Sequence, residues 1–155
     1  MLTRRSLLRY TTLAASAALV GPIAWRGARA APAKPPVALF KNPGCGCCEE
    51  YAAYLRQHGF TVTVRETDKL ADMSTKAGIP AELEGCHLAF LGGYVVSGHV
   101  PIEAVDKLLT ERLELKGLAL PGMPLGSPGM SGDKAEPFKI QAIDREGKSR
   151  LYITV

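Results

Sequence analysis

The sequence predicts an α/β fold in which flanking helices cover a central mixed sheet. Three observations carry this prediction: a continuous apolar run at residues 37–40, apolar residues at helical spacing over residues 48–55, and alternation through residues 60–64. The 155 residues suit one domain, and 46% hydrophobic with 22% charged residues is typical of globular proteins. Disordered, collagen-like and coiled-coil structures are therefore disfavoured.

The first half of the expected domain alternates strands with helices. The run at residues 37–40 predicts a strand that is covered on both faces. The helical spacing over residues 48–55 predicts a helix that stops at Gly59, and residues 60–64 predict a second strand. Thr67-Asp68 is expected to cap a short helix.

The second half is expected to contain two hairpins with a helix and a long loop between them. Residues 86–91 and 94–97 flank a two-glycine turn, which favours a tight hairpin. A helix is predicted from Pro101, because proline suits the first helical position. Residues 117–137 are rich in Met, Pro and Gly without periodicity and predict a loop, and residues 138–155 predict a C-terminal β-hairpin.

The first 30 residues have the features of an export signal. Residues 1–30 combine a charged start, an apolar stretch and a small-x-small end, and the pair Arg4-Arg5 resembles a twin-arginine signal. Residues 31–36 predict a linker and residues 37–155 a single domain. The sequence thus predicts a periplasmic protein, with no stable membrane insertion after signal cleavage because the apolar stretch is too short to span a bilayer.

The charge balance disfavours a nucleic-acid partner. The formal net charge is +4, but five of the 19 basic residues and no acidic residue lie in the first 30 positions. The rest of the chain has 14 basic and 15 acidic residues, a net charge of −1. Phosphate binding needs a concentrated positive surface, which this part of the chain does not offer.

The four cysteines are the strongest indication of function. Cys45, Cys47 and Cys48 lie at the predicted start of a helix, where free amides and the helix dipole stabilise a thiolate. The order of elements is that of a thioredoxin-like domain, in which the position of Cys86 faces the motif. By this analogy all four thiols converge.

Thiolates select Cu(I), zinc and iron–sulfur clusters. A zinc ribbon would need two separated Cys-x-x-Cys pairs, which the sequence lacks. Adjacent Cys47 and Cys48 suit several Cu(I) ions that are bridged by thiolates better than one tetrahedral ion. Two structural disulfides are the alternative for an exported protein, and the crowding of three cysteines argues against it.

Further soft donors lie outside the cysteine motif. Met123 and Met130 occupy a segment with no apolar face, which makes them candidate copper ligands. His99 follows the predicted hairpin and is expected to be a ligand or the hydrogen-bond partner of one. His87 is a weaker candidate, because strand alternation would point it away from Cys86.

Taken together, these motifs resemble the CopG-like family of exported copper-handling proteins, formerly labelled a domain of unknown function. The resemblance covers essentially all of residues 31–155. It rests on Lys41-Asn42-Pro43-Gly44-Cys45-Gly46-Cys47-Cys48, Cys86-His87, Gly98-His99-Val100-Pro101, Gly122-Met123-Pro124 and Gly126-Ser127-Pro128-Gly129-Met130. The resemblance implies a thioredoxin-like fold, copper binding through the cysteine motif, and a role in periplasmic copper handling that includes interconversion of Cu(I) and Cu(II).

Two classes of function remain open from the sequence. The first is a copper-resistance protein whose partners are copper ions and other periplasmic copper-handling proteins; coupling to a dithiol–disulfide change would make it a copper-linked oxidoreductase. The second is a thiol–disulfide oxidoreductase with Cys45 as nucleophile and Cys48 as resolving thiol. An arsenate-reductase-like enzyme is a distant third, suggested by Asn42-Pro43-Gly44-Cys45-Gly46 alone.

Overall fold

The computed structural model describes residues 33–155, which belong to one compact unit, Pro32–Val155. The predicted export signal at residues 1–30 and the start of the predicted linker lie outside the described residues.

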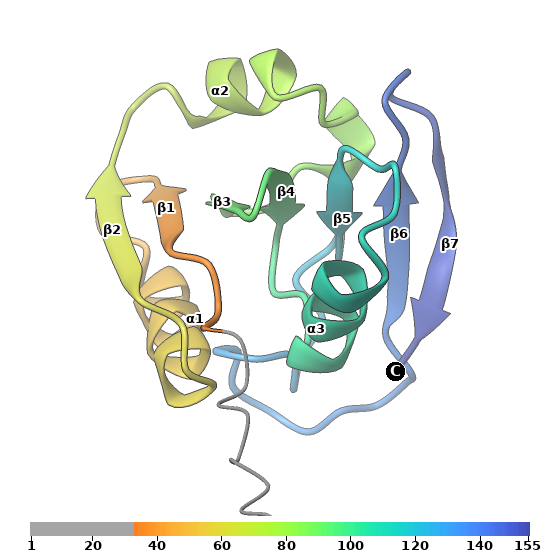
Figure 1. Cartoon of the computed structure of the whole chain (residues 1–155). Coiled ribbons are helices and arrows are strands. Elements are labelled where there is room, and N and C mark those ends of the chain that lie inside the picture. The colour runs from red at the N-terminus through yellow and green to blue at the C-terminus, as the bar shows by residue number, and fades with distance from the viewer. Residues whose placement is uncertain (1–32) are drawn as a thin grey trace, which may run out of the picture. The chain divides into compact units, whose positions relative to one another are not determined.

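A single mixed sheet of seven strands organises the described residues (Figure 1). The strand order is β2-β1-β3-β4-β5-β6-β7; the β1–β2 and β4–β5 pairs are parallel and the others antiparallel. The predictions of an α/β fold with a mixed sheet and of a C-terminal hairpin are confirmed. The strands are β1 (Val37–Lys41), β2 (Val62–Glu66), β3 (His87–Leu91), β4 (Tyr94–Ser97), β5 (Gly117–Ala119), β6 (Lys139–Ile143) and β7 (Ser149–Thr154).

Helices cover both faces of the sheet (Figure 1). Helices α1 (Gly46–Gln57) and α3 (Ile102–Glu111) pack into the larger apolar core on one face. Helix α2 (Leu70–Lys76) and a short 3₁₀ turn (Ala81–Leu83) pack into a smaller core on the other face. Among the described residues, no helix is long and apolar enough to cross a membrane.

The elements around the cysteines follow directly from the sequence pattern. The buried residues of α1 are those predicted from the helical spacing, namely Cys48, Tyr51, Ala52 and Leu55. The β3–β4 turn has φ of 56° at Gly92 and 86° at Gly93, the primed geometry that glycine adopts without strain. The cysteine helix and the hairpin behind it are thereby fixed by local sequence.

Strand β5 corrects the prediction that residues 117–137 form an uninterrupted loop. The strand has only three residues, too few for any periodicity to show. At its start, any side chain larger than hydrogen on Gly117 would collide with the carbonyl oxygen of Val95 on β4. The glycine that suggested a loop therefore permits close strand pairing.

Several element boundaries also differ from the prediction, among them those of α2, β2 and α3. Helix α2 begins after Lys69 without a side-chain cap, and Thr67 instead accepts a hydrogen bond from the Lys69 amide at 3.1 Å. Strand β2 begins two residues later than expected, at Val62, and Pro101 precedes α3 as its N-cap. These differences do not move the cysteines.

Candidate metal centre

A salt bridge anchors the loop that leads to the cysteines. Lys41, at the end of β1, donates a hydrogen bond to Oε1 of Glu66 at the end of β2, at 2.8 Å. The same oxygen accepts a hydrogen bond from the amide of Gly44 at 3.4 Å. Cys45 then follows in extended conformation as the N-cap of α1. The loop thus delivers the cysteine motif to the first turn of the helix.

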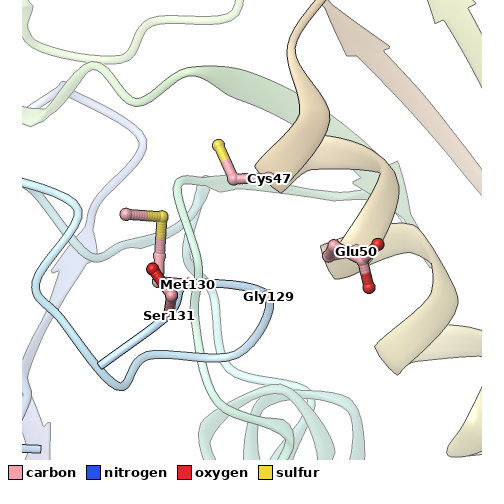
Figure 2. Close-up of a pocket in the computed structure, with 5 residues that line it drawn as sticks. All are labelled: Cys47, Glu50, Gly129, Met130 and Ser131. Carbon is pink, nitrogen blue, oxygen red and sulfur yellow. The ribbon is translucent and has the colours of Figure 1, made fainter. Parts of the chain in front are cut away.

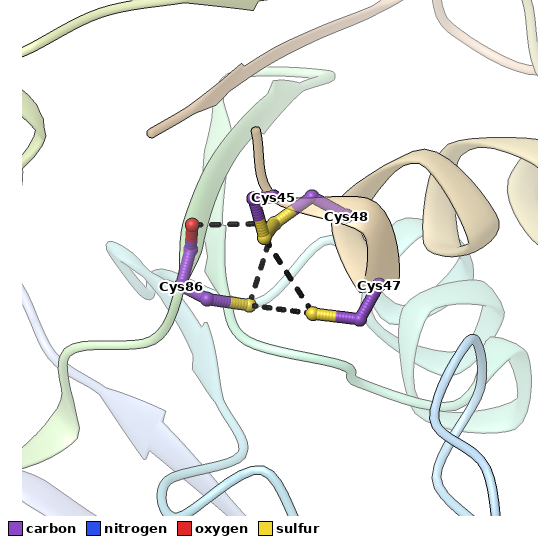
Figure 3. A group of neighbouring side chains, drawn as sticks. All are labelled: Cys45, Cys47, Cys48 and Cys86. Carbon is purple, nitrogen blue, oxygen red and sulfur yellow. Dashed lines mark hydrogen bonds between the residues drawn. A yellow bond between two sulfur atoms is a disulfide. The ribbon is translucent and has the colours of Figure 1, made fainter. Parts of the chain in front are cut away.

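The four cysteine sulfurs meet between the start of α1 and the start of β3 (Figure 3). All four lie within 4.8 Å of one another. The Sγ–Sγ distances are 3.5 Å between Cys45 and Cys47, 3.8 Å between Cys47 and Cys86, and 3.5 Å between Cys48 and Cys86. The structure therefore brings together all four predicted cysteine ligands; their role as ligands stays a prediction.

One disulfide is present within the group. Cys45 and Cys48 are bonded, while Cys47 and Cys86 are free thiols. The alternative of two structural disulfides does not describe this arrangement, because two thiols remain and both touch the bonded pair. The group combines a dithiol–disulfide pair with two further soft donors.

His99 is buried beside the cysteines and its ring is oriented by the loop after β5. Its Nδ1 donates a hydrogen bond to the carbonyl oxygen of Pro128 at 2.6 Å. A carbonyl only accepts, so the proton of the neutral ring lies on Nδ1 and Nε2 carries a lone pair. Nε2 lies 3.1 Å from Sγ of Cys86. Burial lowers the pKa of His99, which keeps the ring neutral and its Nε2 available as a ligand.

His87 also lies against Cys86, contrary to the expectation that it would point away. Its Nδ1 is 3.6 Å from the Cys86 sulfur, and its ring stacks on Tyr51 with centroids 4.5 Å apart. The residue begins β3, where alternation does not yet separate it from its neighbour. Burial, and then the nearby His99, lower the pKa of His87 to about 3, so it stays neutral. Its Nε2 has no hydrogen-bond partner among the described residues.

Burial keeps the Cys86 thiol protonated when no metal is bound. Burial first, and then the Cys47 sulfur, raise the pKa of Cys86 to about 12. A thiol in this state is a poor nucleophile. A soft metal ion that binds this sulfur would have to displace the proton, which would couple metal binding to proton release at this residue.

A cleft of about 490 Å³ opens beside the sulfurs (Figure 2). Cys47 and Glu50 of α1 line one side, and Gly129, Met130 and Ser131 line the other. The Cys47 thiol and the Met130 thioether both face this space. Of the four cysteines, Cys47 is the one that this cleft opens to solvent.

Met123, the other predicted methionine ligand, is not one of the residues that line this cleft. Its side chain is 40% exposed and its backbone is in the left-handed region, with φ of 46°. The geometry thus favours Met130 over Met123 as a donor, and the prediction for Met123 rests on the sequence alone.

Three features of the site were missed by sequence reasoning. The Pro128 carbonyl orients His99, and Tyr51 packs against both histidine rings. Gly129 passes so close to α1 that a Cβ there would stand 2.6 Å from the amide nitrogen of Tyr51. Only Gly129 could have been noticed in the sequence, because it belongs to the repeated glycine pattern of the loop. The contacts of Pro128 and Tyr51 with the histidines depend on long-range packing, which the sequence does not show.

The chain is similar to one family model and to two solved structures. A model of a family described as a protein of unknown function, DUF411, matches residues 83–130. Two solved structures, forms 1 and 2 of copper resistance protein CopG, each match with a TM-score of 0.73 and 32% identity. Each match covers 79% of this chain and 98% of the other. The chain belongs to the CopG-like family.

The CopG-like match extends well beyond the family-model segment, which begins after the cysteine motif and ends at Met130. A search of curated proteins finds no match. The resemblance stated from the motifs is therefore confirmed at the level of the family, and the relatives in that family are copper resistance proteins by name.

Proposed function

We propose that this protein is an exported, periplasmic copper-resistance protein that binds Cu(I) through clustered cysteine thiolates. The proposal includes a multinuclear cluster in the fully reduced protein and coupling to Cu(I)/Cu(II) conversion. The names of the structural relatives support the copper assignment, and the export signal predicted at residues 1–30 supports the location.

The convergence of the four sulfurs carries the proposal. Four donors within 4.8 Å exceed what one disulfide needs, and thiolates prefer soft ions such as Cu(I). Cys45, Cys47 and Cys86 are only partly buried, whereas Cys48 is fully buried, so ions can reach the group on the side of the cleft. A sulfur that bridges two ions lets adjacent Cys47 and Cys48 serve together.

His99 and Met130 complete the donor set in this proposal. The fixed hydrogen bond from Nδ1 to Pro128 holds the Nε2 lone pair toward Cys86, as outer partners of metal-bound histidines commonly do. Met130 lies across the cleft from Cys47 and supplies a neutral thioether, which suits Cu(I) better than Cu(II). Met123 belongs to the same loop and is included on sequence grounds.

Cys45 and Cys48 supply the redox part of the proposed activity. Their Cys-x-x-Cys spacing at the N-terminus of α1 supports reversible disulfide formation, since the helix terminus stabilises the thiolate form of the reduced pair. Closing this disulfide releases two electrons, enough to reduce two Cu(II) ions. In this version the protein is a copper-linked oxidoreductase.

A thioredoxin-like fold and a role among other periplasmic copper-handling proteins belong to the same proposal. The parallel β1–α1–β2 unit, followed by the antiparallel β3–β4 hairpin and α3, supports the thioredoxin-like comparison. Cys86 precedes β3, where thioredoxins place a proline, so the substrate-binding feature of that fold is replaced by a metal donor.

The test is an anaerobic Cu(I) titration of reduced residues 31–155 against a chromogenic chelator, with free thiols counted before and after. We expect uptake of more than one copper per chain, with the thiols protected from alkylation. Cys47→Ser should weaken uptake strongly, because Cys47 contacts both Cys45 and Cys86. No uptake at chelator-competitive affinity would contradict the proposal.

A thiol–disulfide oxidoreductase that acts on other proteins is the second candidate, and the Cys45–Cys48 disulfide is the observation that favours it. The same variant separates the two functions. A protein disulfide reductase that uses Cys45 and Cys48 keeps its activity in Cys47→Ser, whereas a copper cluster does not survive the change. Full reductase activity together with unchanged copper binding in the variant would favour the enzyme.

A further inference from the structure

Closing the Cys45–Cys48 disulfide does not empty the site of donors. Three soft or borderline donors stay free beside it: the Sγ atoms of Cys47 and Cys86 and the Nε2 atom of His99. They come from three separate segments, the first turn of α1, the residue before β3 and the segment after β4. The oxidised pair therefore lies next to three remaining donors, of which Figure 3 shows the two thiols of Cys47 and Cys86.

The spacing of these donors suits one d¹⁰ metal ion. Such an ion lies about 2.3 Å from a thiolate sulfur, so two sulfurs on it stand about 3.8 Å apart in tetrahedral and about 4.0 Å apart in trigonal geometry. The Cys47 and Cys86 sulfurs are 3.8 Å apart.

Hydrogen bonds hold the third donor, Nε2 of His99, next to Cys86. Nε2 of His99 is 3.1 Å from the Cys86 sulfur and accepts a hydrogen bond from its thiol. When an ion replaces that proton, the nitrogen and the sulfur separate to about 3.5 Å, a movement of a few tenths of an ångström. The Pro128 carbonyl keeps the His99 ring in its plane during this change.

We propose a division of labour among the four cysteines: Cys45 and Cys48 carry the electrons, while Cys47, Cys86 and His99 form a site that retains one Cu(I) when that pair is oxidised. This inference rests on the proposed function and specifies how much copper the oxidised protein keeps. Oxidation lowers the copper content of the protein in a step, from the multinuclear cluster to one ion, instead of emptying the site.

Cu(II) is the oxidant in this proposal, and the electrons balance. The thiolates of Cys45 and Cys48 each lose one electron and form the S–S bond, and any protons that they carried pass to solvent. Two Cu(II) ions accept these electrons and become two Cu(I) ions. One Cu(I) is kept by the Cys47–Cys86–His99 site; the other, together with the further Cu(I) ions that the reduced cluster held, leaves through the cleft beside Cys47.

The retained ion also protects the second pair of thiols. Cys47 and Cys86 are close enough to approach each other, and a second disulfide would remove every thiolate from the site. An ion bound to both sulfurs blocks this reaction, because the electron pairs that would form the bond are already engaged. Copper occupancy and resistance to a second oxidation are therefore linked.

The experiment compares two defined redox states of residues 31–155. One sample is fully reduced; the other is mildly oxidised, freed of oxidant, and checked by alkylation and peptide mass mapping to carry only the Cys45–Cys48 bond. Both are titrated anaerobically with Cu(I) against a chromogenic chelator. We expect more than one copper in the reduced sample and one in the oxidised sample, with Cys47 and Cys86 protected from alkylation only in the presence of copper.

Matched variants test which residues bind the Cu(I) ion that the oxidised protein retains. The double variant Cys45→Ser/Cys48→Ser should bind one Cu(I) under reducing and oxidising conditions alike. His99→Gln should lower the Cu(I) affinity of the oxidised form at least tenfold. In wild-type protein of the oxidised form, a challenge with diamide should produce the Cys47–Cys86 disulfide only in the copper-free sample.

The possible outcomes separate this inference from the function beneath it. Several copper ions in the reduced sample and none in the oxidised one would overturn the division of labour and leave the proposed function intact. An oxidised sample whose single copper is insensitive to His99→Gln and leaves Cys47 reactive would also overturn it. No copper in either sample would overturn both.

Discussion

Gly129 is the residue at which the methionine loop comes closest to the cysteine helix. Its φ of 81° lies in the left-handed region, and a Cβ would stand 2.6 Å from the Tyr51 nitrogen and 3.0 Å from the Cys47 carbonyl oxygen. Both contacts are with backbone, which cannot turn away. We therefore predict that Gly129→Ala pushes Met130 away from Cys47 and speeds alkylation of the Cys47 thiol.

Gly122 is a matched control in the same loop. It has φ of 80°, but nothing lies within 4 Å of the position of its Cβ. Gly122→Ala should lower the free energy of unfolding by about 1–2 kcal/mol, the cost of holding alanine in the left-handed conformation. Gly129→Ala should lower it by about 1–3 kcal/mol more, because the added methyl group also overpacks the contact with α1. Chemical unfolding of the reduced protein measures this difference; equal losses in the two variants would show that the close approach is not rigid.

The two methionines of the loop after β5 are expected to contribute differently to copper binding. Met130 lines the cleft with Cys47, whereas Met123 is exposed and does not. Met130→Leu preserves size but removes the thioether, so Cu(I) affinity should fall about tenfold, while Met123→Leu should leave it nearly unchanged. Competition titrations with the chelator measure both. A larger loss in Met123→Leu would favour the prediction that the sequence alone made for that residue.

Sequence periodicity predicted those helices and strands that local interactions determine. Helix α1 buries the four residues that its spacing indicated, and the Gly92-Gly93 pair forms the tight turn between β3 and β4 as expected. Strand β5 could not be predicted, because it is three residues long and exists only through pairing with β4 and β6. The same holds for the Pro128 contact to His99, which joins residues 29 positions apart.

The ends of β1 and β2 give a prediction about pH. Hydrogen bonding to Lys41 lowers the pKa of the Glu66 carboxyl. A carboxyl whose pKa is lowered by folding stabilises the protein above its unfolded pKa, and this contribution is lost as the pH falls through the folded value. Glu66→Gln should therefore lower the Tm slightly near neutral pH, and the gap to wild type should close below about pH 4.

Thermal unfolding from about pH 7 to about pH 3 tests this expectation. Glu82→Gln is a suitable control, because Glu82 is exposed and forms no salt bridge among the described residues. A constant difference between Glu66→Gln and wild type at every pH would show that the loop anchor depends on side-chain shape and not on charge.

Over the whole chain, the charge distribution separates the predicted export signal at residues 1–30 from the other residues. All five basic residues of the first 30 positions would leave with a cleaved signal, and so would Trp25, the only tryptophan. The rest of the chain then has a net charge of −1 and four cysteines. Those cysteines would meet an oxidising compartment, where unprotected neighbouring thiols form disulfides.

We predict that the protein is exported in the folded state, which would protect its cysteines from oxidation during transport. A twin-arginine signal is read by a receptor that accepts folded cargo, so the cysteines can be enclosed, or loaded with copper, before they reach the periplasm. Arg4→Lys with Arg5→Lys keeps the charge but removes the arginine pair. The double variant should stay in the cytoplasm with Trp25 still present, whereas wild type should reach the periplasm without tryptophan fluorescence. Cell fractionation with intact mass measurement decides between them. A double variant that is exported and cleaved as efficiently as wild type would show that export does not depend on the arginine pair, and would overturn the prediction of export in the folded state.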